Sequence, residues 1–151
     1  MLNHLLRSLS KREQSNIVFN QYQDNDICNN LRLYLEYLLG NKPPMLLIGE
    51  APGYNGCRLT GIPFTSGAMI EKSGHRIFKE IRSQIVLHRV ASENTATILW
   101  EFLGRDREVP ILWNAFPFHP HSIDKLESNR KPNKLEIEEG KECLKIVYNL
   151  F

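Results

Sequence analysis

Leucines recur at helical spacing in the first quarter of the chain. The apolar positions are Leu31, Leu35, Leu38 and Leu39. This spacing predicts a helix with one apolar face, and Gly40-Asn41 followed by Pro43-Pro44 is typical of its end. Nearer the N-terminus, Leu5, Leu6 and Leu9 predict a short amphipathic turn. A polar stretch through Asp26 separates the two segments.

Two apolar runs are too short to be helices. Met45–Gly49 lies between a helix-ending signal and a glycine-rich turn, and Val109–Trp113 precedes Asn114 and a proline-rich loop. Short runs that are apolar throughout are typical of strands buried in a parallel sheet. We therefore expect both runs to be fully buried parallel strands.

The remaining apolar patterns predict helices. Ile77, Ile81 and Ile85 follow helical spacing within 74–90, and Leu135–Phe151 forms a further amphipathic segment. Thr95–Leu103, stopped by Gly104, fits a helix, although Thr97–Trp100 also fits a strand. Alternation of helices and strands predicts an α/β protein with a parallel sheet covered by helices on both faces.

The ends of the two predicted strands are the expected location of a site. Ligands in such sheets bind outside the carboxyl ends of the strands, so Gly49–Gly53 and Asn114–His121 are expected to converge. In Gly49-Glu50-Ala51-Pro52-Gly53 the two glycines leave backbone N–H groups open to a ligand. The nearby stretch Thr60–Gly67 adds the aromatic ring of Phe64.

Composition places few limits on function. The 151 residues fit one domain, 1–151, and the net charge of +2 permits nucleic-acid binding without arguing for it. The three cysteines, Cys28, Cys57 and Cys143, match neither a disulfide framework nor a metal spacing, so we expect reduced thiols in a cytoplasmic protein. No apolar run is long enough to span a bilayer, and no signal peptide is visible.

Three residues near the strand ends are candidates for ligand binding, each with a structural alternative. Asn114 offers an acceptor and a donor that match the N3–H and O4 edge of uracil, or it ties its own loop in an Asx turn. Phe64 stacks on a base or fills the core. Glu50 acts on water, or it accepts hydrogen bonds at the strand end.

Other polar residues are weaker candidates. His119 and His121 alternate with prolines, so they are candidates for phosphate contact or acid–base chemistry, or they are exposed loop residues. They lack a third ligand, and no metal site is expected. Arg58, Arg130 and Lys131 are candidate phosphate contacts or solvated surface charges.

The order of these motifs resembles the uracil-DNA glycosylase superfamily. The matching segments, from about Leu31 to the end, are Gly49-Glu50-Ala51-Pro52-Gly53, Gly61-Ile62-Pro63-Phe64, Leu112-Trp113-Asn114-Ala115 and Asn129-Arg130-Lys131-Pro132. The resemblance implies a three-layer α/β/α sandwich around a parallel sheet of about four strands. It also implies base excision repair of uracil-containing DNA, by base flipping and cofactor-free hydrolysis of the N-glycosidic bond.

The resemblance also implies roles for individual residues. The backbone at Glu50 and Ala51 would bind O2 of the base, Phe64 would stack on it, and Asn114 would recognise its polar edge. Gly49 would also belong to the base-binding residues. Fixed N–H donors would stabilise the uracil anion as the bond breaks. Residues expected to contact the DNA are Pro52, Gly53, Arg58, Ser66, His119 and His121.

The chain departs from the family pattern at several positions. Ala51 replaces the water-activating Asp, which leaves Glu50 as the nearest candidate catalytic group, and Gly53 replaces the Tyr that excludes thymine. The branch with a Gly-Glu-Ala-Pro-Gly motif usually carries four cysteines for an iron–sulfur cluster; three are present here, so no cluster is expected. The family's C-terminal His-Pro-Ser motif is absent, so we expect a C-terminally truncated domain or a loss of activity.

Three functions remain open at this point. The first is a uracil-DNA glycosylase-type hydrolase, and the second is a catalytically impaired module that binds uracil or DNA. A small-nucleotide enzyme with a phosphate cradle at Gly49–Gly53 is the third, although no GxGxxG motif or Walker-type lysine follows the turn.

Overall fold

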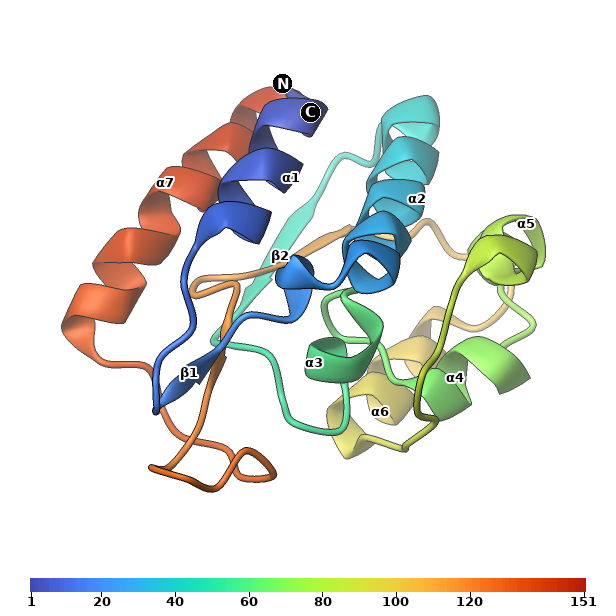
Figure 1. Ribbon diagram of the computed structural model, residues 1–151. Coiled ribbons are helices and arrows are strands. Elements are labelled where there is room, and N and C mark those ends of the chain that lie inside the picture. Colours follow the sequence, from blue (N-terminus) through green and yellow to red (C-terminus); the bar gives the residue numbers. More distant parts are fainter.

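Helices and short strands are interspersed along the chain in the computed structural model, which describes residues 1–151 (Figure 1). The longer helices are α1 (Leu2–Lys11), α2 (Asn25–Asn41), α6 (Asn94–Leu103) and α7 (Lys134–Leu150). Shorter helical segments are η1 (Gln21–Gln23), α3 (Cys57–Thr60), α4 (Gly67–Lys72), α5 (Arg76–Ile81) and η2 (Arg82–Gln84). The strands are β1 (Val18–Phe19), β2 (Leu46–Gly49), β3 (Ile111–Asn114) and β4 (His119–Pro120).

The strands form two separate pairs. β2 and β3 are parallel, with Leu46 opposite Ile111 and Gly49 opposite Asn114. β1 and β4 are antiparallel, and they join the segment after α1 to the loop after β3. The protein is therefore a mixed α/β structure in which the parallel pair supplies the strand ends expected from the sequence.

Helices from both ends of the chain pack together. In Figure 1, α1 stands between α7 and α2 and contacts both of them. The phenol of Tyr34 on α2 connects these three helices to β3, because it accepts a hydrogen bond from the N–H of Leu112 at 2.9 Å. One continuous apolar core includes residues of α1, α2, β3 and α7, so the two ends of the sequence belong to the same folding unit.

The strand Met45–Gly49 is parallel as predicted, but the expectation of full burial is wrong. Ile48 is 48% exposed and Met45 is 60% exposed, whereas all four residues of β3 are buried. β2 pairs only with β3, so its other edge and part of one face lie open. An apolar run signals burial without specifying how many neighbours the strand has.

The helix predicted over 74–90 is also shorter than expected. α5 ends at Ile81, and η2 ends at Gln84. The side chain of Asn30 then binds the backbone of Val86 in both directions, at 2.8 Å to its carbonyl and 3.0 Å from its N–H. This bond to another element holds residue 86 outside a helix, and it cannot be recognised from helical periodicity.

The other helices predicted from the sequence are present in the structure, and their extents are now defined. Leu5, Leu6 and Leu9 belong to a complete helix, α1, rather than to a turn. The ambiguous segment Thr95–Leu103 lies in the helix α6, which ends at Gly104 with φ of 62°. The predicted helix at the C-terminus is α7, which begins with a capping box between Asn133 and Glu136.

Candidate functional site

The two predicted strand ends meet. Beyond the paired residues Gly49 and Asn114, the N–H of Ala115 donates to the carbonyl of Gly49 at 2.8 Å. The N–H of Phe116 donates to the carbonyl of Glu50 at 3.0 Å. These bonds continue the parallel pairing into the turn, so they fix the Gly-Glu-Ala-Pro-Gly segment against the end of β3.

A pocket of about 360 Å³ opens at this point. It unites the turn with residues far away in the sequence, including the segment before α6 and the loop before α7. The lining residues are Gly49, Glu50, Ala51, Pro52, Gly53, Cys57, Phe64, Glu93, Thr95, Asn114, Asn129, Arg130 and Lys131. All five predicted base-binding residues therefore line one cavity.

Gly49 leaves room for the two side chains predicted to hold a base. A Cβ atom at this position would overlap the ring of Phe64 and lie 2.9 Å from Oδ1 of Asn114. Phe64 itself has φ of 56°, in the left-handed region that a bulky residue rarely adopts. Its carbonyl accepts a hydrogen bond from the indole of Trp100 at 3.0 Å, which holds this backbone in place. Backbone strain of this kind is often found at functional sites.

The side chain of Asn114 is free to bind a ligand. Asn114 is 5% exposed and lines the pocket, yet its side-chain amide makes no hydrogen bond within the protein. An Asx turn would require such a bond, so the structural alternative for Asn114 is wrong. Phe64 is half-buried, with part of its ring packed against the core and part lining the pocket. Core filling therefore accounts for only part of the Phe64 ring.

The turn also presents backbone donors. The N–H groups of Glu50 and Ala51 donate no hydrogen bond within the protein. In contrast, the carbonyls of Gly49 and Glu50 each accept one. Unpaired N–H groups in a tight turn bind anionic or carbonyl oxygens. The side chain of Glu50 is 55% exposed at the rim, with a carboxylate oxygen 3.7 Å from Nζ of Lys131.

Glu93 is a site residue that no sequence pattern singled out. It is the residue before α6, but its carboxylate does not cap that helix. The carboxylate instead lies against Gly53 and Gly56, where any Cβ atom would overlap it. No hydrogen bond or ion pair neutralises it, and burial raises its pKa. The glycine at the end of the turn therefore makes room for Glu93, a role different from the open ligand approach that we expected.

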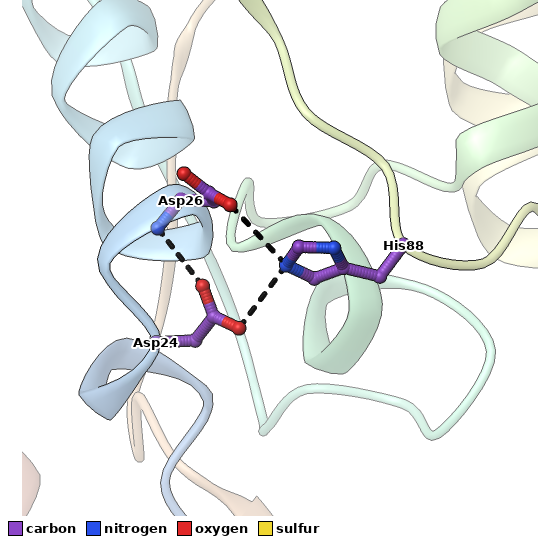
Figure 2. Close-up of side chains that lie close together, drawn as sticks. All are labelled: Asp24, Asp26 and His88. Atoms are coloured by element: carbon purple, nitrogen blue, oxygen red, sulfur yellow. Dashed lines mark hydrogen bonds and ion pairs between the residues drawn. The ribbon is translucent and has the colours of Figure 1, made fainter.

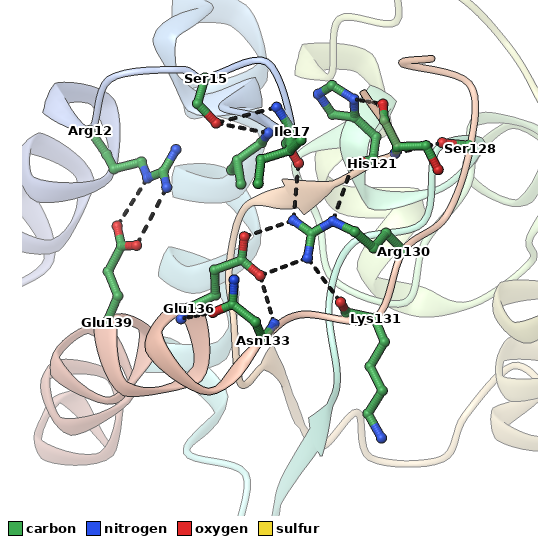
Figure 3. A network of polar contacts seen from close by, with 12 residues as sticks. Arg12, Ser15, Ile17, His121, Ser128, Arg130, Lys131, Asn133, Glu136 and Glu139 are labelled. Atoms are coloured by element: carbon green, nitrogen blue, oxygen red, sulfur yellow. Dashed lines mark hydrogen bonds and ion pairs between the residues drawn. The ribbon is translucent and has the colours of Figure 1, made fainter. Parts of the chain in front are cut away.

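Arg130 lines the pocket, but its charge is fully engaged (Figure 3). Its guanidinium donates to both carboxylate oxygens of Glu136, at 2.7 and 2.9 Å. It also donates to the carbonyls of Ile17, His121 and Lys131, so all five N–H donors are used. This bonding favours a structural role over a phosphate contact. Lys131 extends away from the network toward Glu50 and remains 83% exposed.

The same interactions explain the charge state of Glu136. Burial acts to raise its pKa, but the hydrogen bonds from Arg130 and from the N–H of Asn133 outweigh burial and lower the pKa below the usual glutamate value. We call Arg130, Asn133 and Glu136, with the carbonyls of Ile17, His121 and Lys131, the Arg130 network.

The predicted DNA contacts at the two histidines do not fit the structure. His119 is completely buried, with its ring nitrogens 2.7 Å from the carbonyl of Pro52 and 3.0 Å from that of Leu126. His121 is also buried, and its Nδ1 lies 2.8 Å from the carbonyl of Ser122. Neither residue is the exposed loop histidine of the structural alternative. His119 instead positions the turn, and burial lowers its pKa.

Two other predicted DNA contacts have structural roles as well. Ser66 is buried and caps α4 by accepting a hydrogen bond from the N–H of Met69. Arg58 is 7% exposed, donates to the carbonyl of Tyr54 at 2.8 Å, and lies outside the pocket lining. Pro52 and Gly53, in contrast, line the pocket with the base-binding candidates.

The cysteines are free thiols, as expected. Cys57 reaches the pocket lining, but burial raises its pKa to about 12. The thiol is therefore protonated at neutral pH and unsuited to act as a nucleophile.

One cluster outside the pocket contains metal-ligand types of side chain (Figure 2). Nε2 of His88 lies 3.1 Å from Oδ2 of Asp24 and 3.6 Å from Oδ2 of Asp26. The other oxygen of Asp24 accepts from the N–H groups of Asp26 and Ile27 at the start of α2. All three side chains are exposed, and helix capping with ion pairing accounts for the arrangement.

Comparison with known proteins gives no match, either to a model of a protein family or to a curated protein. Among the helices of the structure, none combines the length and the apolar character needed to cross a membrane.

Proposed function

We propose that this chain is a single uracil-DNA glycosylase-like domain that binds a flipped uracil and hydrolyses its N-glycosidic bond. One observation carries the proposal: a half-buried aromatic ring, an unpaired amide and two unpaired N–H groups all belong to one pocket. In this proposal the β2–β3 pair is part of the family's three-layer sandwich, and the protein acts in the cytoplasm on uracil-containing DNA without a cofactor.

Phe64 and Asn114 provide recognition. The ring of Phe64 stacks on the flipped base, and such stacking is worth roughly 1–3 kcal/mol per base. The Asn114 amide accepts from N3–H and donates to O4 of uracil. Cytosine presents an acceptor at N3 and an amino group instead, so a fixed amide discriminates between the two bases.

The turn provides stabilisation of the leaving group. As the bond between C1′ and N1 breaks, negative charge spreads over the uracil ring to O2. The N–H groups of Glu50 and Ala51, held by the pairing to β3, donate to that oxygen. Donors fixed before the reaction lower the barrier without reorganisation, and removing one typically costs about 10²–10³ in rate.

A second candidate function is uracil or DNA binding without turnover. Ala51 favours it, because a methyl group there cannot activate water as the family's Asp does. In that case the pocket would bind uracil or abasic DNA with no product formed.

A gel assay with 5′-labelled oligonucleotides tests the proposal. We expect strand breaks after alkaline treatment of a uracil-containing oligonucleotide, in single- or double-stranded form, and none with cytosine or thymine at the same position. Failure to cleave at high protein concentration, with retained affinity for abasic DNA, would favour the binding module. Absence of both activities would exclude both functions, and thermal stabilisation by phosphate without any effect of uracil would point to a nucleotide enzyme.

A further inference from the structure

The Glu93 carboxylate is the polar group of the pocket with the least evident structural purpose. The backbone carbonyl of Glu93 begins α6, accepting from the N–H of Thr97 at 3.0 Å and from its hydroxyl at 3.1 Å. Ser, Thr, Asp or Asn at this position commonly caps the helix, whereas the longer side chain of Glu93 makes no capping hydrogen bond. It extends instead into the cavity that contains Phe64 and Asn114.

Two glycines make room for this side chain. A Cβ atom on Gly53 would overlap Oε1 of Glu93, and one on Gly56 would overlap Oε2. Neither Gly53 nor Gly56 has a positive φ, so the left-handed region does not explain them. The Glu93 carboxylate occupies the space into which a Cβ atom at either position would project.

The carboxylate has no partner, although cationic side chains occur nearby. Arg130 is bound to Glu136, and Lys131 lies beside Glu50. The other titratable groups of the lining are Glu50 and the protonated thiol of Cys57. A partly buried carboxylate without a hydrogen bond or a counter-ion is costly for folding, and such groups are concentrated at functional sites.

We propose that Glu93 is the catalytic base that activates water in this pocket, taking the place of the Asp that Ala51 replaces. The inference rests on the proposed glycosylase function. Water oxygen bonds to C1′ as the C1′–N1 bond breaks, and the electron pair of that bond leaves with uracil. Glu93 accepts the proton of the water. The products are an abasic deoxyribose and a uracil anion, which is then protonated from solvent.

Glu93 suits this step better than Glu50. Glu50 lies at the rim, where its side chain is 55% exposed to solvent and its carboxylate is 3.7 Å from Nζ of Lys131. Burial raises the pKa of Glu93, and a carboxylate with a raised pKa is a stronger base. The rate is therefore expected to rise with pH as Glu93 loses its proton and then to level off.

Matched variants test the assignment. In single-turnover assays we expect Glu93→Gln to release uracil at least about 100-fold more slowly than the wild type, and Glu93→Asp to retain measurable activity. Glu50→Gln is expected to lose less than about 10-fold. The acid limb of the pH–rate profile should disappear in Glu93→Gln and persist in Glu50→Gln. Affinity for an oligonucleotide with 2′-fluorinated deoxyuridine, which resists cleavage, should change less than about 3-fold.

The outcomes separate this inference from the proposed function. An inactive wild type would overturn both. An active wild type with an equally active Glu93→Gln variant would overturn the role of Glu93 alone. Loss of affinity in parallel with rate would show that Glu93 shapes the pocket instead of activating water. Thermal melting of all variants detects misfolding; if Glu93→Gln does not fold, added formate should restore the rate of Glu93→Ala, and absence of rescue would overturn the inference.

Discussion

The pocket and the Arg130 network lie side by side, and they differ in whether their polar groups have hydrogen-bond partners. In the network every donor of Arg130 and both oxygens of Glu136 are bound. In the pocket the amide of Asn114 and the carboxylate of Glu93 have no partner in the protein. Paired polar groups stabilise a fold, whereas unpaired groups lower its stability and are available to a ligand. The comparison predicts that mutations in the network reduce stability and that mutations in the pocket reduce activity.

Asn114→Ala should give the largest change in activity. We expect uracil release to fall at least about 100-fold, because the edge of the base loses its fixed partner. The free energy of unfolding should fall less than in Glu136→Ala, since no protein hydrogen bond is lost. Single-turnover kinetics and urea denaturation measure the two effects.

Asn133→Ala is the matched control for Asn114. Its side chain caps α7, so the loss of this cap should cost about 1 kcal/mol of stability with uracil release nearly unchanged. If Asn133→Ala impaired release as strongly as Asn114→Ala does, the division between pocket and network would be incorrect.

Glu136→Ala should give the largest change in stability. The variant loses two hydrogen bonds from Arg130 and half of the capping box, and we expect a loss of about 2–3 kcal/mol in urea denaturation. Glu138→Ala, whose exposed carboxylate pairs only with Lys141, should lose less than about 0.5 kcal/mol. Equal losses in the two variants would contradict the importance of the network.

The Glu136 carboxylate is also expected to make the free energy of unfolding depend on pH. The folded pKa of Glu136 lies below the usual value of 4.5. Its ionised form therefore stabilises the fold above that value, and the contribution is lost as the pH falls through the lowered pKa. Unfolding measured from neutral to acidic pH should show a steeper loss in the wild type than in Glu136→Ala. Parallel curves of stability against pH for the two proteins would argue against a lowered pKa of Glu136.

Phe64→Ala should weaken binding by an intermediate amount. Losing the ring that stacks on the base is expected to cost roughly 1–3 kcal/mol, or about 5- to 150-fold in affinity. The affinity can be measured for abasic DNA with added uracil or for uncleavable uracil DNA. Phe102→Ala provides a control, because that ring is 65% exposed and lies outside the pocket. An effect of Phe102→Ala as large as that of Phe64→Ala would indicate a different binding surface.

Lys131→Ala should have the smallest effect. Its exposed ammonium lies at the pocket rim, so a phosphate contact there would make the salt dependence of DNA binding shallower by about one unit of slope. Stability should change by less than about 0.5 kcal/mol. Fluorescence anisotropy at several salt concentrations measures the slope, and an unchanged slope would exclude the contact.

The sequence was sufficient for most of the longer helices, for the parallel strand pair and for the meeting of the two strand ends. Leucine spacing predicted α2, the short apolar runs predicted the parallel strands, and the strand-end rule brought Gly49 and Asn114 together. These features depend on neighbours along the chain or on a general property of parallel sheets. Residue types alone also made Phe64 and Asn114 candidates, although they left the structural alternatives open.

Contacts between distant segments account for the predictions that failed. The side chain of Asn30 ends the helical path before Val86, and β2 is exposed because only β3 pairs with it. His119 and His121 were predicted to contact DNA or to be exposed loop residues, but both rings are buried and lie within hydrogen-bond distance of backbone carbonyls. Prolines predict an extended loop, and they do not show what packs against it.

Local residue types are sufficient to predict the turn Gly49–Gly53 and its place after a strand, because glycine and proline constrain the backbone locally. The pairing of polar groups depends on the assembled fold. This fold bound Arg130 to Glu136 and left Asn114 unpaired, and it placed Glu93 against two glycines more than 35 residues earlier in the chain. Hydrogen bonding and desolvation depend on atoms close in space, so they follow from the assembled fold and cannot be read from spacing along the chain.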